Sequence, residues 1–419
     1  MTSSRAAWLS PRLITLCLAV ALALIAQSPV LHGAEPAPAA APAPPTDPPT
    51  TGPNTLMPEE QAAGWLLLFD GQTLFGWQPT SKADWKVADG VISVTSGEKG
   101  LLATTSQWAD YRFKADFRAP AATNSGIFLR TPLQPTDPAK DCYELNIAAP
   151  AVSPFFTGSF VGRQKAEAVE LSDDWHTFDV TLEAGHCTVK IDDRQVLDYT
   201  DATPLGRGHI GLQLNSGQVE FRNVKLLPLG LEPLFNGKDL EGWKIFPDKP
   251  SKFTVTPEGE LQLSKGPGQL ETTTQYADFC LQLDVRTASR GLNSGVFFRS
   301  IPGGWWQGYE AQISNTFRRG DRTQPFDFGS GGIYRRQPAR RVVANDMEWF
   351  RMTVVAVGNH LATWVNGYPV CDFTDERPAN DNPREGLRLA PGTISLQGHD
   401  PTTNLLFRRF EIAEMPPKE

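Results

Sequence analysis

The sequence repeats itself, and this internal repeat limits the possible folds more than any other feature of the chain. Residues 68–71 (Leu-Phe-Asp-Gly) recur at 234–237 (Leu-Phe-Asn-Gly), residues 124–126 (Asn-Ser-Gly) recur at 293–295, and residues 143–144 (Tyr-Glu) recur at 309–310. The period of about 170 residues is much longer than a solenoid repeat and has the length of a whole domain. The sequence therefore predicts two copies of one domain in tandem.

Hydrophobic and polar residues alternate inside each copy. Phe113, Ala115 and Phe117 alternate with charged residues in the first copy, and Leu281 and Leu283 do so with polar residues in the second. A period of two is typical of half-buried antiparallel strands. Gly and Pro are frequent between these runs, and no long helical pattern is present. Each copy is therefore predicted to be all-β, a two-sheet sandwich of the jelly-roll type.

The N-terminal region differs in composition from both copies. An apolar run from Leu13 to Ala26 follows two arginines and precedes small residues, which is the pattern of a bacterial export signal. Residues 35–53 are nearly all Ala, Pro or Thr, which indicates an extended spacer. We therefore predict a signal peptide (1–33), an Ala/Pro-rich linker (34–58), a first sandwich (59–229) and a second sandwich (230–419). The protein is then periplasmic or secreted, without stable membrane insertion after signal removal; an uncleaved membrane anchor is the alternative.

The net charge of −8 argues against a polyanionic partner. Nucleic acid carries a dense negative charge, so no nucleic-acid binding is expected. The cysteines form no CxxC pair and the histidines no HExxH pattern, so no cofactor and no metal site are predicted, although a bound divalent cation stays open.

The same alternation predicts which polar side chains of the second copy share a face. Along one strand, every second side chain points to the same side of the sheet. Three such stripes carry polar residues: Glu310 and Gln312; Gln397 and His399; Asn293 and Arg299. A concave sheet face with polar side chains is suited to holding an extended sugar. We therefore expect the three stripes to lie on one sheet.

These residue types point to proton-transfer chemistry. A carboxylate, an imidazole and a guanidinium together are able to remove a proton, return it and stabilise an oxyanion. The alternative is structural, with Glu310 in an ion pair with Arg299 and His399 as a satisfied loop residue. Trp305 and Trp306 follow two glycines; they either stack on sugar rings or form a hydrophobic plug at the end of the sandwich.

Six motifs occur in order along the chain: Leu-Phe-Asp/Asn-Gly with a later Gly-Trp, Asn-Ser-Gly-Ile/Val-Phe, Tyr-Glu-x-Gln-Ile, Gly-Gly-Ile-Tyr at 331–334, Asn-Gly at 366–367 and a final Gln-x-His. Their order and spacing resemble the 3-keto-disaccharide hydrolase family, also described as 3-keto-glucoside-1,2-lyase and 3-keto-2-hydroxy-glucal hydratase. They cover nearly all of residues 59–419, twice over. The resemblance implies two concanavalin A-like, laminarinase-like sandwiches and a saccharide partner of the 3-keto-glycoside class.

The resemblance also implies a chemistry. A ketone at C3 of a sugar acidifies the C2 hydrogen, so that an enolate forms, the C1 substituent leaves and water adds to the resulting glucal. Glu310 is then a candidate base, His399 a proton donor or second base, and Arg299 with Gln312 a holder of the enolate oxygen. Which of Glu310 and His399 is acid or base stays open, as does a hydrolase or lyase outcome. The candidates for substrate binding in the second copy are Gln312, Asn293, Gln397, Trp305, Trp306 and Tyr334.

The first copy departs from this pattern. It keeps Asn124, Arg130 and Glu144, which are candidates for substrate binding, but it has Asn146 in place of the motif's Gln and Asn215 in place of the His. Catalysis is therefore expected in the second copy.

Two other functions stay open from the sequence. A pair of non-catalytic carbohydrate-binding modules fits the same fold, because a fold alone does not determine function. An ordinary laminarinase-type hydrolase is disfavoured, because the ExDxxE strand motif that places two carboxylates around the scissile bond is absent from both Tyr-Glu strands.

Overall fold

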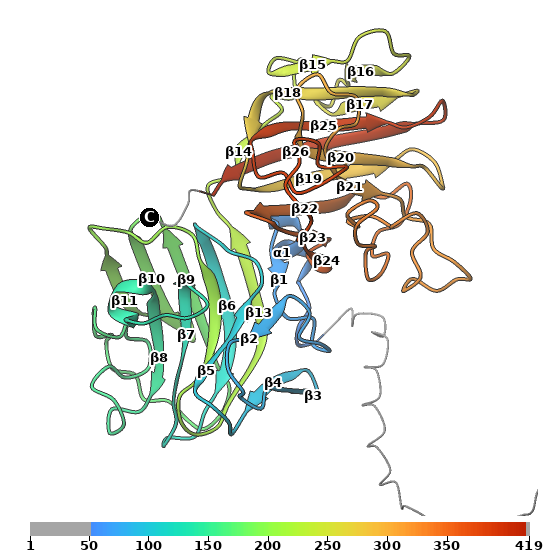
Figure 1. Ribbon diagram of the computed structural model, residues 1–419. Coiled ribbons are helices and arrows are strands. Elements are labelled where there is room, and N and C mark those ends of the chain that lie inside the picture. Colours follow the sequence, from blue (N-terminus) through green and yellow to red (C-terminus); the bar gives the residue numbers. More distant parts are fainter. Residues whose placement is uncertain (1–51, 416–419) are drawn as a thin grey trace, which may run out of the picture. The chain divides into compact units, whose positions relative to one another are not determined.

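The computed structural model describes residues 52–415, and this part of the chain is almost entirely β-structure (Figure 1). Helix is limited to α1, Pro58–Ala63, and α2, Pro138–Asp141. The strands form four sheets, and each sequence copy contributes two of them. The predicted all-β fold of two tandem sandwiches is confirmed.

The first sandwich pairs an eight-stranded with a five-stranded antiparallel sheet. The larger sheet has the order β11-β10-β9-β6-β13-β4-β3, with β1 also paired to β13, and the smaller has the order β2-β5-β12-β7-β8. The larger sheet contains β1 (Leu66–Leu67), β3 (Lys86–Ala88), β4 (Val91–Val94), β6 (Tyr111–Arg118), β9 (His176–Glu183), β10 (His186–Ile191), β11 (Arg194–Thr200) and β13 (Val219–Pro228). The smaller sheet contains β2 (Trp77–Pro79), β5 (Gly100–Thr104), β7 (Asn124–Thr131), β8 (Tyr143–Ala148) and β12 (His209–Leu214).

The second sandwich has the same architecture. Its larger sheet has the order β16-β17-β26-β19-β22-β23-β24, with β14 paired to β26, and its smaller sheet has the order β15-β18-β25-β20-β21. The larger sheet contains β14 (Glu232–Pro233), β16 (Lys252–Val255), β17 (Leu261–Ser264), β19 (Phe279–Thr287), β22 (Phe350–Val357), β23 (His360–Val365), β24 (Tyr368–Thr374) and β26 (Asn404–Glu414). The smaller sheet contains β15 (Trp243–Ile245), β18 (Gly268–Tyr276), β20 (Ser294–Ser300), β21 (Tyr309–Ile313) and β25 (Gly392–Gly398). The sequence repeat is thus a repeat of strand topology.

The hydrophobic core of each sandwich lies between its two sheets. Phe113 and Ala115 of β6 and Leu281, Leu283 and Val285 of β19 are all fully buried. Burying one such large apolar side chain stabilises the fold by about 1.5–3 kcal/mol. The alternation seen in the sequence therefore separates the core face of these strands from the outer face.

The described end of the expected linker is part of the first sandwich. Asn54 is buried and exchanges hydrogen bonds with Asn223: the Asn54 N–H donates to Asn223 Oδ1 (2.6 Å), and the Asn223 N–H donates to Asn54 Oδ1 (2.8 Å). The predicted signal peptide and most of the linker lie outside the described residues. Within residues 52–415, no helix is long and apolar enough to cross a membrane.

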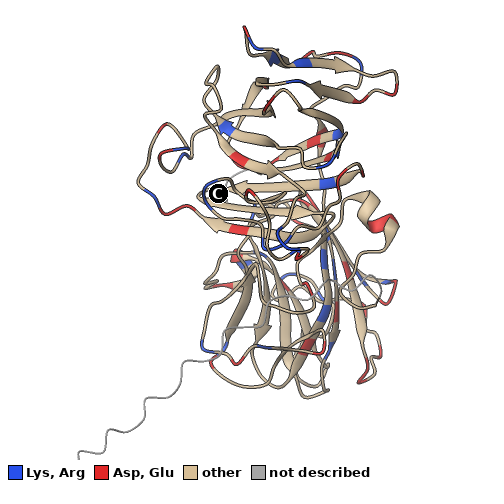
Figure 2. Ribbon diagram, turned by 90° about the vertical axis from the view of Figure 1, so that its right-hand side faces the viewer, with Lys and Arg blue, Asp and Glu red and all other residues tan. Residues whose placement is uncertain are grey.

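Charged residues of both signs are interspersed along the strands of both sandwiches (Figure 2). Opposite charges meet on neighbouring strands, as where Arg112 and Lys114 of β6 pair with Asp179 of β9. Some basic residues of the strands are therefore neutralised within the sheets.

Candidate active site

Three neighbouring strands in the smaller sheet of the second sandwich carry the predicted site. In the ladder, β21 pairs with β20, and β20 pairs with β25. Residue Phe297 of β20 lies opposite Glu310 on one side and opposite Ser395 on the other. The three polar stripes therefore lie on one sheet, as expected from the alternation.

A cavity of about 320 Å³ opens on this face. It is lined by Asn293, Trp306, Glu310, Gln312, Tyr334, Arg335, Arg384, Gln397 and His399. Seven of these nine were candidates from the sequence, while Arg335 and Arg384 were not. Such a volume lies within the usual range of small-ligand pockets.

Glu310 lies at the buried end of the cavity and is 3% exposed. Arg384 Nη2 donates to Glu310 Oε2 at 2.7 Å. Gly295, on the neighbouring strand, leaves room for the carboxylate, because a Cβ at this position would collide with it. Burial raises the pKa of Glu310 above its ordinary value, and the Arg384 cation opposes this rise. The third residue of the Asn-Ser-Gly motif therefore has a steric role at the site.

Arg384 is held in place by contacts besides the ion pair. Its Nε donates to the Trp306 carbonyl (3.1 Å), and its guanidinium carbon lies 4.9 Å from the ring centre of Phe297 and 5.4 Å from that of Tyr334. A guanidinium stacked on two aromatic rings loses little further freedom when it binds a ligand. Arg384 is therefore a preorganised cation next to the carboxylate.

Two amide side chains that line the cavity have oxygens without a hydrogen-bond donor in the described part of the chain. Gln312 Nε2 donates to the Asp327 carboxylate and to the Asp327 carbonyl, both at 2.9 Å, so the amide group has a fixed orientation. Within the described part of the chain, Gln312 Oε1 and Gln397 Oε1 are buried without a hydrogen-bond donor. Each is therefore available to accept a hydrogen bond from a ligand.

His399 and Trp306 form one wall of the cavity. The two rings are parallel, with centres 6.1 Å apart, and His399 Nδ1 lies 2.9 Å from Asp400 Oδ2. Trp305 is absent from the lining; it stacks on Trp306 at 4.7 Å and packs against Phe246 at 4.9 Å. Trp306 is thus placed to contact a ligand, whereas Trp305 supports it from behind.

Arg299 does not belong to the site, so this expectation was wrong. The side chain is fully buried, and its guanidinium donates to the carbonyls of Ala277 (2.7 Å), Gly358 (2.6 Å) and Arg388 (3.1 Å) and to the Asp278 carboxylate (2.9 Å). The alternative of an ion pair with Glu310 is wrong as well, since Glu310 pairs with Arg384. Arg299 ties loops of the second sandwich together.

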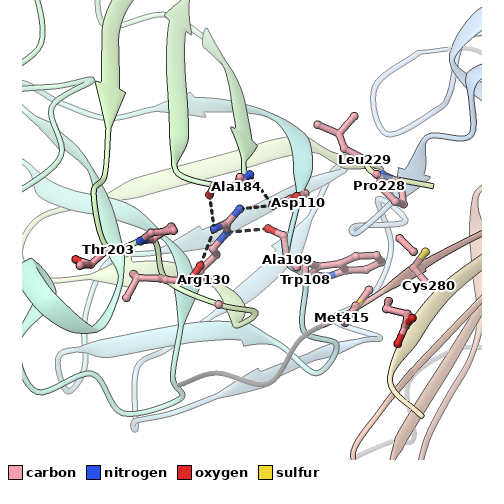
Figure 3. Close-up of a pocket in the computed structure, with 16 residues that line it drawn as sticks. Trp108, Ala109, Asp110, Arg130, Ala184, Thr203, Pro228, Leu229, Cys280 and Met415 are labelled. Carbon is pink, nitrogen blue, oxygen red and sulfur yellow. Dashed lines mark hydrogen bonds and ion pairs between the residues drawn. The ribbon is translucent and has the colours of Figure 1, made fainter. Parts of the chain in front are cut away.

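Arg130 has the same role in the first sandwich, so its assignment to substrate binding was also wrong. Figure 3 shows its guanidinium enclosed by protein acceptors. These are the Ala109 carbonyl (2.7 Å), the Ala184 carbonyl (2.9 Å), the Leu205 carbonyl (2.6 Å) and the Asp110 carboxylate (2.7 Å). The repeated Ala-Asp pair of the sequence is thus part of an arginine anchor that both copies preserve.

A break in the strand register explains both errors. The pairing of β20 with β25 shifts between Phe297 and Ser300, and Arg299 has a left-handed backbone (φ 46°). The pairing of β7 with β12 shifts in the same way, and Arg130 has φ 51°. Such an irregularity turns a side chain to the opposite face. Alternation therefore predicted Asn293 correctly and failed at the end of the same strand.

Arg384, which the sequence analysis missed, lies in an insertion of the second copy. Trp175 and Trp349 are 174 positions apart, but Gly208 and Gly392 are 184 apart, so the second copy has ten additional residues there. Arg384 belongs to this segment. The sequence signal that could have indicated Arg384 is a basic residue within an insertion near the predicted site.

The first sandwich has a larger cavity on the equivalent face, of about 490 Å³. Its lining includes Lys99, Asn124, Glu144, Asn146, Gln213 and Asn215. Asn124 and Glu144 are therefore where the sequence placed them, at a concave polar pocket. Val161 stands at the position of Tyr334, and no arginine lines this cavity within the described residues.

The carboxyl group of Glu144 has a different electrostatic environment from that of Glu310. It is 7% exposed, its hydrogen bond comes from Gln213 Nε2 (3.3 Å), and no Lys or Arg among residues 52–415 forms an ion pair with it. Burial without a cation raises the pKa of Glu144 to about 7. The two equivalent carboxyl groups thus differ in their counter-ion.

Comparison with protein families gives a match over both halves of the chain. The sequence model of the 3-keto-alpha-glucoside-1,2-lyase-like domain matches residues 64–227 and again residues 230–413. No curated protein sequence matches the chain significantly.

Several solved structures are similar to part of the chain. A candidate glycosyl hydrolase from Parabacteroides distasonis is 21% identical, with 42% of this chain and 100% of that chain covered and a TM-score of 0.39. A family 66 carbohydrate-binding module from Bacillus subtilis is 17% identical (36% and 94% covered, TM-score 0.29). A β-glucanase from Bacillus licheniformis is 15% identical (44% and 97% covered, TM-score 0.30).

Proposed function

Because the chain belongs to the 3-keto-alpha-glucoside-1,2-lyase-like domain family, which both of its halves match, we propose that it is a carbohydrate-active enzyme whose second sandwich cleaves 3-keto-glycosides. The observation that carries this proposal is the Glu310–Arg384 pair at the buried end of a sugar-sized cavity. A buried carboxylate next to a fixed cation supplies both a base and a site for a developing oxyanion.

The first step is removal of the C2 proton. The ketone at C3 makes this hydrogen acidic, and a Glu310 carboxylate oxygen takes the proton while the electron pair forms an enolate. Burial makes the ionised carboxylate a stronger base than in water, and the Arg384 cation opposes the rise in its pKa. The negative charge moves to the C3 oxygen, where Arg384, and Arg335 at the rim, are able to donate hydrogen bonds.

The second step expels the C1 substituent. The enolate restores the C3 carbonyl, a C1–C2 double bond forms, and the C1–O bond breaks with its electrons on the leaving oxygen. His399, whose orientation is fixed by Asp400 and Trp306, is placed to give that oxygen a proton. Water then adds at C1 and gives a proton to His399, which is thereby restored, while the proton held by Glu310 returns to C2. The unpaired oxygens of Gln312 and Gln397 accept hydrogen bonds from the sugar hydroxyls.

The N-terminal sequence supports export as part of the same proposal. A periplasmic or secreted enzyme meets saccharides outside the cytoplasm, which agrees with the export-signal pattern and the spacer that follows it. Mass spectrometry of the mature protein tests this, because loss of residues 1–33 is expected and an intact N-terminus on membrane-bound protein would contradict it.

The decisive experiment is incubation of the mature protein with an aryl 3-keto-glucoside and with its unoxidised parent. Release of the aglycone from the keto substrate alone is expected. Cleavage of the parent glycoside would instead indicate an ordinary glycoside hydrolase. Saturable binding without release from either compound would indicate a pair of carbohydrate-binding modules.

A further inference from the structure

Two buried amide oxygens of the first sandwich lack a hydrogen-bond donor within the described chain. They are Asn146 Oδ1 and Gln213 Oε1. Asn146 is 2% exposed, and both residues line the cavity of about 490 Å³. An unpaired buried acceptor costs about 1–3 kcal/mol, so buried polar groups nearly always have partners. The missing donors are therefore expected from a ligand.

The direction of both amides is set by the protein. The NH₂ group of Asn146 donates to the Phe155 carbonyl, and that of Gln213 donates to Glu144 Oε1 at 3.3 Å. Each amide thus uses its donor group inside the protein, and its oxygen is left without a donor although the residue lines the cavity. Flipping either amide would lose the existing bond, so these oxygens are fixed acceptors.

Glu144 adds a third acceptor to the same wall. Its carboxyl group is buried, and the only other charged side chain lining this cavity within residues 52–415 is Lys99, which is exposed. A ligand that fits has to offer several donors close together. The hydroxyl groups of a sugar ring meet this requirement.

The equivalent cavity of the second sandwich has the same two amide oxygens but adds strong donors. Gln312 and Gln397 correspond to Asn146 and Gln213, whereas Arg335, Arg384 and Tyr334 have no equivalent at the first cavity. A ketone or enolate oxygen only accepts hydrogen bonds, so it needs these donors. At the acceptor-rich first cavity, a sugar that keeps its hydroxyl fits better than one oxidised to a ketone.

We propose that the cavity of the first sandwich is a binding site for unoxidised saccharide, which donates hydroxyl hydrogen bonds to Asn146, Gln213 and Glu144 and is not cleaved. Asn124, Asn215 and Lys99 line the same cavity and supply donors for the ring and bridging oxygens. The contrast with a keto sugar rests on the proposed function of the second sandwich, whereas binding of an unoxidised sugar does not.

Calorimetric titration of the mature protein with trehalose, maltose and cellobiose tests this proposal. At least one of these sugars is expected to bind at millimolar concentration or below. Asn146→Leu should weaken that binding about tenfold or more, because one buried acceptor is lost. The matched change in the second sandwich, Gln312→Leu, should leave binding of the unoxidised sugar within about twofold and lower keto-glucoside cleavage instead. If Asn146→Leu does not fold, Gln213→Met removes the other acceptor and is expected to weaken binding in the same way.

Three results would overturn the proposal. They are absence of binding for all three sugars, binding that survives the first-cavity variants but disappears in Gln312→Leu, and a first cavity that binds a keto-glucoside more tightly than its parent. Cleavage of the keto substrate is measured separately on the unaltered protein. If no sugar binds but the keto substrate is cleaved, the binding site is rejected and the proposed activity stands. If a sugar binds at the first cavity but the keto substrate is not cleaved, the proposed activity is rejected and the binding site stands.

Discussion

The cavities of the two sandwiches are built on the same strands but surround their glutamates with different charges. Glu144 and Glu310 occupy equivalent positions on β8 and β21, and each lies near two unpaired amide oxygens. Only Glu310 has an arginine partner, and that arginine comes from a segment that the first sandwich lacks. The comparison shows that the sheet supplies the amide oxygens without donors and that a loop supplies the cation.

The same comparison separates structural from chemical motifs. Arg130 of the first sandwich and Arg299 of the second make matching contacts, although only one sandwich is expected to be catalytic. The motif that each belongs to is therefore explained by folding. Among the arginines, the difference between the halves rather than the shared motif points to the candidate for a chemical role, Arg384.

The largest expected effect is on stability. Arg299→Met and Arg130→Met should each lower the free energy of unfolding by about 3–5 kcal/mol, because several carbonyls and a partly buried carboxylate lose a hydrogen-bond donor. Urea unfolding of both variants measures this. If either protein fails to fold, Arg299→Lys and Arg130→Lys provide milder versions. A stable Arg299 variant that loses only activity would show that this residue acts in catalysis after all.

The second effect is on activity. Glu310→Gln keeps the size of the side chain but removes its basicity, so kcat/KM on a 3-keto-glucoside should fall about a hundredfold or more. Glu144→Gln is the matched control and should change the rate by less than about twofold. If Glu144→Gln abolishes cleavage and Glu310→Gln does not, the reaction takes place in the first sandwich, and the Arg384 cation is not needed for it.

Much of this comparison was accessible from the sequence. The duplication, the sheet faces and the positions of Glu310, Gln312, Gln397 and His399 follow from repeated motifs and from a period of two. Arg299 was misplaced because a local shift in strand pairing reverses the face of a side chain, and no residue pattern reports such a shift.

Arg384 was missed for a different reason. It reaches the site from an irregular segment, where the direction of a side chain depends on tertiary contacts such as those with Phe297 and Tyr334. Periodicity carries no information there. The sequence was thus sufficient for residues held by the sheet and insufficient for residues delivered by loops.

The third prediction concerns the dependence of stability on pH. Because burial raises the pKa of Glu144 from 4.5 to about 7, ionisation of this group opposes folding, and the cost grows between these two values and is complete above pH 7. Glu144→Gln should therefore stabilise the protein by roughly 2 kcal/mol at pH 8 and by little at pH 4. Urea unfolding at both pH values measures the difference.

The matched Glu310→Gln variant should be stabilised less at pH 8 than Glu144→Gln. Burial raises the pKa of Glu310 as well, so loss of its charge favours folding, but the substitution also removes the partner of the partly buried Arg384 cation. Stabilisation of equal size by both substitutions would show that the two glutamates do not differ in their counter-ion.

The fourth prediction is a shift in the pH profile. Arg384→Gln removes the cation that lowers the pKa of Glu310, so this pKa should rise further. Since the base has to be ionised, the acid limb of kcat/KM should move to higher pH, with a loss of about tenfold at neutral pH. A lower rate with an unmoved acid limb would mean that Arg384 affects only the binding of the substrate.

The smallest expected effect comes from an attempt to convert the first sandwich into a second active site. The combined change Val161→Tyr and Asn215→His restores two residues that the family pattern contains in the second half. If these two positions were what the first site lacks, cleavage should nearly double when both sites work. We expect a change of less than about 1.2-fold, because the segment that carries Arg384 is still absent and Glu144 stays without a cation. To remove the background of the native site, the same change is made in the Glu310→Gln protein, where recovery of cleavage would be readily measured. Recovery there would mean that histidine and tyrosine are sufficient to complete the site, and the loop cation would then be dispensable in both sandwiches.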